Sequence, residues 1–255
     1  MKRIRVIPGL LLHRNGLVKS VKFKDYKYVG DPINAVRIFN DKEVDELAII
    51  DIDASREKRT PDIERIRSIV SEAFMPVAYG GGIRHVEEVE TILFNGVEKV
   101  IINKMSVENP SLISEIAKRF GSQSVVVSID YKKPFFGPVS VFTDNGKTNT
   151  KLDPVQFAKR MEEAGAGEIL LNAIDRDGTF EGYDLPMINK ISHAVNIPVI
   201  ALGGAGSVED FRLAVREGAS AVSAGSMFVF QRPHRAVLIS YPSRDILEEE
   251  LFEQI

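Results

Sequence analysis

The chain repeats one stretch, first as Tyr79-Gly-Gly-Gly-Ile-Arg-His-Val-Glu-Glu-Val89 and again as Leu202-Gly-Gly-Ala-Gly-Ser-Val-Glu-Asp-Phe211. At nearly the same offset each copy is followed by a glycine and a short run, Gly96-Val-Glu-Lys-Val-Ile-Ile102 and Gly218-Ala-Ser-Ala-Val-Ser-Ala224. The repeat period is therefore about half the chain, and not the roughly 20–50 residues typical of a solenoid. The sequence indicates a duplicated fold with two similar halves.

Short apolar runs alternate with helical patterns along the whole chain, which is typical of a parallel sheet with crossover helices. Strands are expected at residues 3–11, 46–52, 76–80, 98–103, 124–130, 168–172, 198–202 and 221–225. Helices are expected at residues 32–44, 61–73, 86–94, 110–120, 154–164, 185–194 and 208–216, and beyond Pro233. Several helices follow an Asp-Pro or Asn-Pro pair, a common start signal. These eight units predict one domain over residues 1–255, a (β/α)₈ TIM barrel built from two similar half-barrels.

Composition narrows the possible classes of protein. A chain of 255 residues with 44% hydrophobic content is long enough for one large core. The formal net charge of −3 argues against a nucleic-acid partner. The sequence contains no cysteine, which excludes disulfides, thiolate metal sites and cysteine nucleophiles. We find no apolar run of membrane-spanning length and no signal-peptide core after Met1, so we expect a soluble cytoplasmic protein without membrane association.

In a TIM barrel the functional groups lie at the carboxyl ends of the strands. The longest connections at this face are residues 12–31 and 131–153, and each follows the first strand of its half. Residues 12–31 carry several lysines among aromatic residues, which indicates a mobile cover that engages an anionic ligand. A solvated surface loop accounts for the same pattern.

Glycine-rich turns follow corresponding strands in the two halves. Backbone amides at such turns bind phosphate, although tight turns need glycine in any case. Because the turns recur in register, we expect two phosphate sites on opposite sides of the barrel mouth. The expected phosphate-binding residues are Gly82, Asn103, Asp177, Gly178, Gly204, Gly225 and Ser226.

The first strand of each half ends differently. Asp130 ends an apolar strand and faces the expected mouth, where a carboxylate is more often catalytic than structural. The corresponding strand reads Arg5-Val-Ile-Pro-Gly-Leu-Leu-Leu12 and ends in leucine. A site with one carboxylate in place of two is expected to bind its ligand without turnover.

The four histidines show no ligand spacing. We interpret each as a surface residue, and we expect no metal and no cofactor; the histidines are His13, His85, His193 and His234.

Taken together, these residues resemble the cyclase subunit of imidazole glycerol phosphate synthase (HisF), a (β/α)₈ barrel of histidine biosynthesis. The resemblance covers nearly the whole chain. It rests on Val18-Lys19, Gly30-Asp-Pro32, Gly80-Gly-Gly-Ile-Arg84, Lys99 with Asn103, Phe120-Gly-Ser-Gln123, Gly167-Glu-Ile-Leu-Leu171, Asp175-Arg-Asp-Gly-Thr179, Gly182-Tyr-Asp184 and Gly203-Gly-Ala-Gly206.

The resemblance implies that ammonia from a docked glutaminase passes along the barrel axis to a phosphorylated small molecule, a bis-phosphorylated nucleotide derivative. It implies a catalytic aspartate pair, of which Asp130 is present and the other is Leu11, with Lys19 as a further catalytic residue. Leucine cannot donate or accept a proton, and general acid–base catalysis typically raises a reaction rate by about 10²–10⁴-fold. Other departures at the mouth are Lys104, Asn172-Ala173 and Leu202.

The resemblance also implies an ammonia gate of four charges at the strand starts. In this sequence all four charges are present, as Arg5, Glu46, Lys99 and Glu168. Charges inside a barrel are costly unless they are paired, so the ring needs a reason to persist. A structural salt-bridge plug would explain the same residues, but within this family the gate is the preferred interpretation.

Three hypotheses follow. In the first, the chain is a HisF paralogue of the kind found in bacterial surface-polysaccharide gene clusters. It conducts ammonia from a HisH-like glutaminase, docked at the amino-terminal face, to a sugar amidotransferase that converts an acetamido sugar to an acetamidino sugar. In the second, it is a histidine-pathway cyclase in which Asp51, Asp53 or Asp177 replaces the missing acid. In the third, it is a non-catalytic scaffold for its glutaminase.

Overall fold

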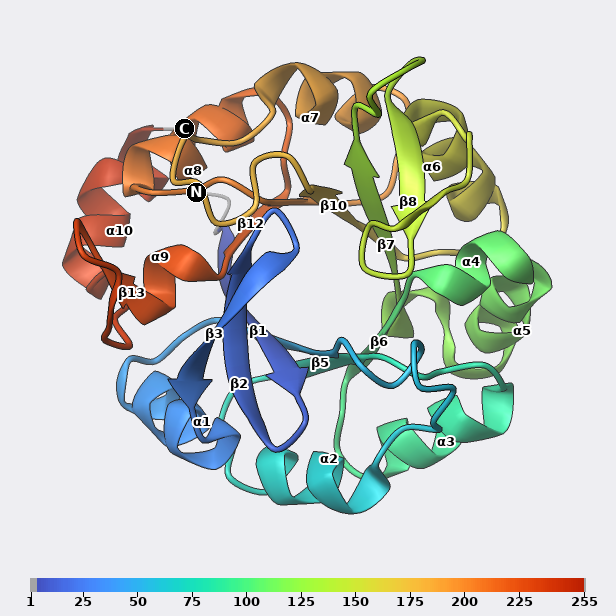
Figure 1. The fold of residues 1–255 in the computed structure, drawn as a ribbon, viewed down its shortest axis with the longest axis horizontal. Coiled ribbons are helices and arrows are strands. Elements are labelled where there is room, and N and C mark those ends of the chain that lie inside the picture. The colour runs from blue at the N-terminus through green and yellow to red at the C-terminus, as the bar shows by residue number, and fades with distance from the viewer. Residues whose placement is uncertain (1–3, 255) are drawn as a thin grey trace.

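The computed structural model describes residues 4–254, and within them eight parallel strands close into a barrel. The closing contact joins β7 to β10, in addition to the pairings along the sheet. Figure 1 looks along the barrel axis, with the helices arranged around the strands. The predicted (β/α)₈ architecture is confirmed. The barrel strands are β1 (Arg5–His13), β4 (Leu47–Asp51), β5 (Val77–Gly80), β6 (Lys99–Ile102), β7 (Val125–Lys132), β10 (Glu168–Ala173), β11 (Val199–Leu202) and β12 (Ala221–Ala224).

The helices occur close to their expected positions. Asp31 and Asp153 cap their helices by accepting backbone hydrogen bonds from Asn34 and Gln156, and each cap is followed by a proline. The helices that cover the barrel are α1 (Pro32–Asp41), α2 (Ile63–Val70), α3 (Val86–Phe94), α5 (Ser111–Phe120), α6 (Pro154–Glu163), α7 (Leu185–Ser192) and α8 (Val208–Arg216). Shorter helices are α4 (Lys104–Glu108), α9 (Ser226–Val229) and α10 (Arg244–Glu250), with 3₁₀ turns at Ser122–Ser124 and Phe252–Gln254.

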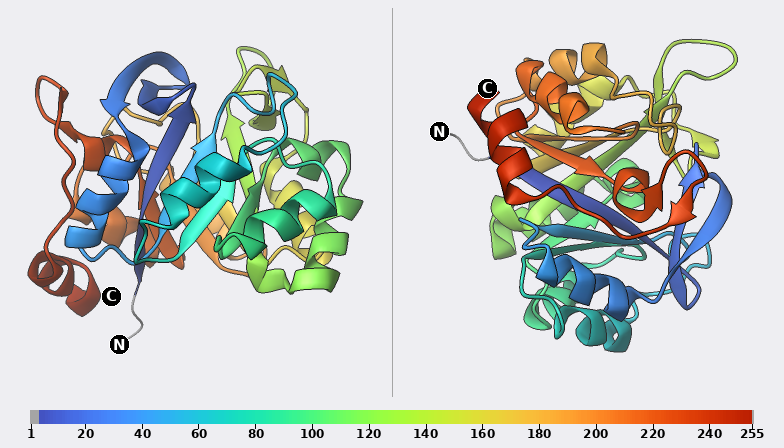
Figure 2. Two further views of the ribbon diagram at one scale, coloured as in Figure 1. Left: turned by 90° about the horizontal axis from the view of Figure 1, so that it is seen from below. Right: turned by 90° about the vertical axis from the view of Figure 1, so that its left-hand side faces the viewer.

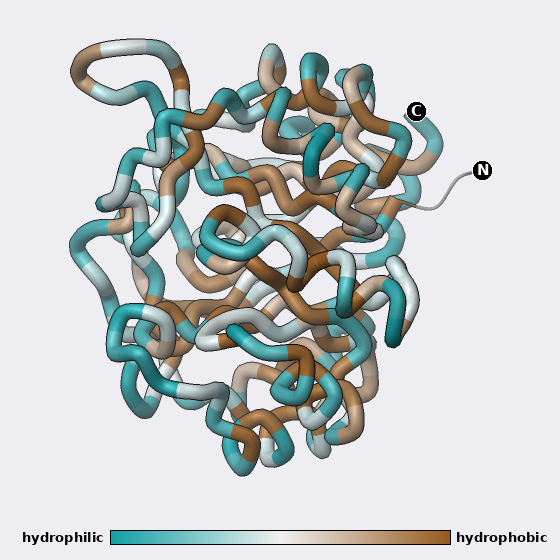
Figure 3. Tube along the Cα trace, turned by 90° about the vertical axis from the view of Figure 1, so that its right-hand side faces the viewer, coloured by the Kyte–Doolittle hydropathy of each residue, from teal (hydrophilic) through white to brown (hydrophobic). Residues whose placement is uncertain are grey.

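Successive residues of each strand pack into two different cores. On β1, Val6 and Leu10 pack in the large core that includes the buried faces of the helices, while Ile7 points into the barrel. The barrel interior is filled by a second apolar cluster. Burying one valine, leucine or isoleucine side chain stabilises the fold by about 1.5–3 kcal/mol. Figure 3 shows apolar segments through the middle of the molecule and hydrophilic segments at its outer turns. The second cluster contains Ile7, Ala48, Ala78, Ile101, Val126, Leu170, Ile200, Leu202 and Ala221.

The two long connections after β1 and β7 are β-hairpins, so residues 12–31 form a paired cover and not the solvated surface loop that was the alternative. Strands β2 (Gly16–Val21) and β3 (Lys24–Gly30) pair with each other, and β2 also pairs with β1. Strands β8 (Ser140–Thr143) and β9 (Thr148–Asn149) form the second hairpin, and β8 pairs with β7. Because β1 and β7 continue into these pairings, they end at His13 and Lys132, two residues later than expected.

Both hairpins lie at the carboxyl ends of the barrel strands, whereas α10 lies at the opposite end (Figure 2). A third, short hairpin follows α9 and consists of β13 (Phe230–Gln231) and β14 (Ala236–Val237). Among residues 4–254, no helix combines the length and the apolar character needed to cross a membrane.

Candidate functional site

A cavity lies at the carboxyl ends of the barrel strands and is covered by the two long hairpins. We call it the mouth cavity. Its walls include Leu11 of β1 and Asp130 of β7, and its cover includes Tyr26 of the first hairpin and Asp144 and Asn145 of the second. The structure thus places the cavity where the sequence predicted functional groups.

Asp130 lies in the wall of the mouth cavity within a small hydrogen-bonded group. Its Oδ1 accepts hydrogen bonds from Asn172 Nδ2 at 3.0 Å and from Ser128 Oγ at 3.3 Å. Burial raises the pKa of Asp130 to about 6, against the opposing effect of these two hydrogen bonds. At neutral pH the Asp130 carboxyl is therefore mostly ionised, and its pKa is close enough to the pH for it to accept and donate a proton.

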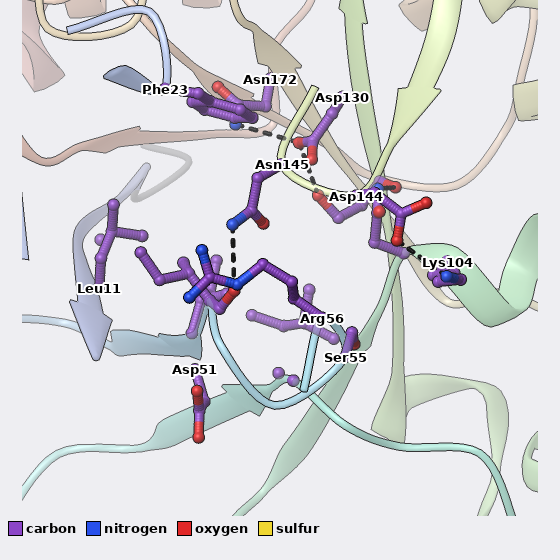
Figure 4. A pocket seen from close by; sticks show the side chains of 18 of the residues that line it. Leu11, Phe23, Asp51, Ser55, Arg56, Lys104, Asp130, Asp144, Asn145 and Asn172 are labelled. Atoms are coloured by element: carbon purple, nitrogen blue, oxygen red, sulfur yellow. Dashed lines mark hydrogen bonds and ion pairs between the residues drawn. The ribbon is translucent and has the colours of Figure 1, made fainter. Parts of the chain in front are cut away.

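Leu11 and Asp130 lie on different sides of the mouth cavity (Figure 4). The side chain of Leu11 is only partly buried, and strand β11 contributes Leu202 to the same cavity. Position 11 therefore offers Asp130 no second proton-transfer group for acid and base steps.

Two of the candidate replacement acids hold the local backbone. Asp51 Oδ1 accepts hydrogen bonds from the backbone N–H groups of Asp53 and Ala54, each at 3.0 Å. Asp53 accepts from the Arg14 N–H at 2.8 Å and lies 2.8 Å from His13 Nδ1. Burial alone would raise the pKa of Asp53, but the hydrogen bonds from Arg14 and His13 lower it below its ordinary value. Asp51 therefore binds backbone N–H groups within the turn after β4, and Asp53 joins this turn to the turn after β1.

The third candidate acid, Asp177, is paired with Lys19. Lys19 Nζ lies 3.1 Å from Asp177 Oδ1, and both side chains are almost completely buried. Ser20 Oγ donates to the other oxygen of the same carboxylate at 3.4 Å. Lys19, which the resemblance implies as a catalytic residue, thus lines the mouth cavity as a buried ion-pair partner of Asp177.

The turn after β5, Gly80-Gly81-Gly82, lines the mouth cavity together with Asn103 and Lys104; we call these five residues the first anion turn. Three of its donors are bound by the protein itself. The Gly82 N–H donates to Ser55 Oγ at 3.2 Å, and Lys104 Nζ lies 2.8 Å from Asp144 Oδ1. Asn103 Nδ2 donates to the Ser128 carbonyl at 3.0 Å.

The second group of expected phosphate-binding residues does not line the mouth cavity, and two of its members, Gly178 and Gly225, lie against the first hairpin; the group is Gly178, Gly204, Gly225 and Ser226. A Cβ on Gly225 would collide with Lys19 Cε, and one on Gly178 would collide with the Ser20 carbonyl oxygen. Among residues 4–254, Ser226 Oγ is one of the few buried side-chain atoms without a hydrogen-bond partner. The two groups of expected phosphate-binding residues therefore differ, because the first lines the mouth cavity and the second does not.

At the opposite end of the barrel, four side chains form a closed ring of alternating charge, which we call the charge ring. Arg5 pairs with Glu46 and, at 2.8 Å, with Glu168. Lys99 Nζ lies 3.1 Å from Glu46 and 3.2 Å from Glu168. Burial alone would lower the pKa of Arg5, but Glu168 and Glu46 raise it above its ordinary value. The sequence had placed these four residues at strand starts, and the structure brings them into contact.

The histidines are mostly at the surface, as expected. His85, His193 and His234 are exposed, but His13 is half-buried between Asp53 and the ring of Tyr26. Within residues 4–254, no group of three or more His, Cys, Asp or Glu side chains has the arrangement of a metal site.

Sequence reasoning placed Asn172 and Lys104 at the mouth but missed their partners, and it missed Ser128 altogether. Ser128 could have been found from its spacing, because it precedes Asp130 by two residues on the same face of β7. Asn172 carries no comparable local signal, since its partner is 42 residues away. The pairing of Lys104 with Asp144 likewise spans 40 residues.

The sequence profile of the histidine biosynthesis protein family matches residues 5–233. The chain belongs to this family. A Pseudomonas aeruginosa protein provisionally named imidazole glycerol phosphate synthase subunit hisF2 is 56% identical over 249 residues, covering 97% of this chain and 99% of that protein. A Leptospira interrogans protein provisionally named as subunit HisF is 49% identical and covers 96% and 97% of the two chains. The imidazole glycerol phosphate synthase subunit HisF of Alkaliphilus metalliredigens is 46% identical and covers 88% and 89%.

Proposed function

We propose that this HisF-like chain is the ammonia-conducting subunit of a glutamine amidotransferase complex and that the carbon–nitrogen bond is formed on another protein. The observation that carries the proposal is the contrast between the two ends of the barrel. The charge ring is complete, while the mouth cavity holds Asp130 with a leucine, Leu11, at the position of its expected partner.

The charge ring suits the entry of a small neutral molecule. Each carboxylate of the ring contacts both cations, so a displaced lysine leaves neither Glu46 nor Glu168 without a partner. Opening at Lys99 is then less costly than breaking an isolated buried pair. Above the ring, the interior is apolar, which favours neutral ammonia over ammonium.

We place the glutaminase at the amino-terminal face, beside the charge ring, where Glu98 offers a charged contact. Hydrolysis of glutamine would release ammonia directly at Arg5 and Lys99. The Pseudomonas, Leptospira and Alkaliphilus relatives are named as subunits, which agrees with a role inside a complex.

For the acceptor we propose an ATP-dependent sugar amidotransferase that receives ammonia from the mouth and converts an acetamido sugar to an acetamidino sugar. In this scheme the ammonia nitrogen replaces the acetamido oxygen after that oxygen has been activated by ATP. The mouth cavity then serves as an exit, which needs no second acid at position 11.

A second candidate is the cyclase reaction of histidine biosynthesis, in which ammonia and a bis-phosphorylated nucleotide derivative give imidazole glycerol phosphate and an aminoimidazole carboxamide ribotide. The names of the relatives favour it. It requires a second acid. Asp51 and Asp177 both line the mouth cavity, but Asp51, like Asp53, accepts hydrogen bonds from backbone N–H groups, so Asp177 is the candidate nearest to meeting that need.

The two candidates are separated by assaying the purified chain for cyclisation with excess ammonium, which bypasses any glutaminase. We expect no cyclisation above the uncatalysed rate. A rate comparable with that of a two-aspartate family member, assayed in parallel, would overturn the proposal in favour of the cyclase. If the chain neither cyclises nor passes ammonia in a glutaminase complex, it is a scaffold.

A further inference from the structure

The second hairpin ends in a turn whose residue types fit its backbone. Asp144, Asn145 and Gly146 all have positive φ, at 52°, 55° and 73°. Aspartate, asparagine and glycine tolerate this conformation best, and Asn-Gly is a strong hairpin signal. The turn between β8 and β9 is therefore specified locally, and it is this turn that covers the first anion turn.

Three contacts hold this hairpin turn in place across the mouth. Asn145 Nδ2 donates to the Ile52 carbonyl at 3.1 Å, and Lys132 Nζ donates to the Gly146 carbonyl at 2.7 Å. Thr148 Oγ1 donates to Asp144 Oδ2 at 2.9 Å. The Asp144 carboxylate is thus oriented from its own hairpin before any ligand is considered.

The oriented carboxylate lies against the cation of the first anion turn. Asp144 Oδ1 is 2.8 Å from Lys104 Nζ, and Glu108 lies 3.6 Å from the same nitrogen. The hydrogen bond that Lys104 donates to Asp144 is the main reason that the pKa of Lys104 is raised. Burial would raise the pKa of Asp144, but Lys104 and Thr148 lower it, so Asp144 is ionised at neutral pH.

Two further donors of this turn are also bound, because the Gly82 N–H donates to Ser55 Oγ and Asn103 Nδ2 donates to the Ser128 carbonyl. The turn that the duplication predicts as a phosphate site therefore has its cation, the Gly82 N–H and the Asn103 side-chain amide bound to groups of the protein. A phosphate arriving there would meet a carboxylate of like charge.

We propose that Asp144 is a specificity-determining residue: its carboxylate takes the place of a ligand phosphate at the first anion turn. The mouth consequently excludes a ligand that carries a phosphate at this end, which rules against a bis-phosphorylated ligand. This inference goes beyond the proposed function, and it is tested by binding, whereas the proposed function is tested by ammonia transfer.

The test measures binding of inorganic phosphate by calorimetry and locates it in crystals of the full chain. We expect Asp144→Asn to bind phosphate about tenfold more tightly than the wild type, since a like charge is removed. A new anion should appear between Lys104 Nζ and the Gly82 turn. Asp175→Asn is the matched control, because Asp175 accepts a hydrogen bond from the Lys133 N–H and pairs with no lysine among the described residues.

Asp144→Ser provides a second variant in case the amide does not keep the hairpin turn, and thermal unfolding checks that each protein is folded. The proposal is overturned if wild-type crystals hold phosphate at Lys104, or if both folded Asp144 variants bind phosphate no more tightly than Asp175→Asn. Tighter binding in both variants without an anion at Lys104 would also overturn it.

Discussion

The ammonium group of Lys19 lies 3.1 Å from the carboxylate of Asp177, and the two residues are separated by 158 positions in the sequence. Both side chains are almost completely buried. The pair fixes the first hairpin over the residues at Gly225 and Ser226, so its strength determines how readily that region becomes accessible.

Lys19→Met is expected to destabilise the protein by about 3–5 kcal/mol, because Asp177 would remain buried without its cation. The double variant Lys19→Met/Asp177→Leu removes the unpaired charge and should recover most of the loss. Urea unfolding of both variants checks this. If the single and double variants are equally destabilised, the contribution of Lys19 comes from packing and not from its charge.

Lys99→Met is expected to cost about 1–3 kcal/mol in stability, less than a fully broken pair, because Arg5 continues to neutralise Glu46 and Glu168. With a folded variant that still binds the glutaminase, glutamine-dependent product formation should change relative to ammonium-dependent formation. The exposed Lys118→Met serves as the control. Proportional changes in both activities would identify the charge ring as a structural plug.

Combined with Asp144→Asn, which frees the first anion turn for phosphate, Leu11→Asp is expected to introduce some cyclase turnover with ammonium salts, because it places a second carboxyl in the wall of the cavity that Asp130 also lines. A restored acid is worth up to about 10²–10⁴-fold where the rest of the site is intact. Leu11→Asn has a similar shape and cannot supply the proton, so it should stay inactive. Equal activity in the two variants would show that the effect of position 11 does not arise from proton transfer.

Asp130→Asn is expected to stabilise the protein at neutral pH. Burial raises the pKa of Asp130 to about 6, so the folded state binds its proton more tightly than the unfolded state does. The favourable contribution of Asp130 is complete below pH about 4 and is lost as the pH rises through about 6. Above that range the variant should be more stable by about 3 kcal/mol.

Denaturant unfolding of wild type and Asp130→Asn between pH 4 and 8 measures this difference. The gap in the free energy of unfolding should open with increasing pH and close near pH 4. A gap that does not vary with pH would mean that the asparagine acts by its shape alone.

The fold could be predicted because its signals are local. Each barrel strand is an apolar run, each half has the same glycine-rich turns, and helices such as α1 and α6 begin with an aspartate cap and a proline. The charge ring was expected from the resemblance to HisF, and the closure of the barrel explains why its four residues meet.

The two covers of the mouth could not be predicted in the same way. Lys19 occurs among other lysines, and its burial depends on Asp177, a partner that only the closed barrel brings near. Asp144 was overlooked because a turn sequence such as Asp-Asn-Gly specifies a hairpin and says nothing of what the hairpin reaches. Contacts between distant loops follow from the stagger of the strands, which a single sequence does not encode locally.

Each long hairpin reaches into the half of the chain to which it does not belong. The hairpin after β1 binds Asp177, and the hairpin after β7 binds Lys104 and the Ile52 carbonyl. If the polypeptide were cut between the halves, each fragment would carry a hairpin that contacts the mouth of the other fragment. A single ancestral half could therefore have closed its ligand sites only as a symmetric pair, and joining the two copies in one chain made that exchange of lids permanent.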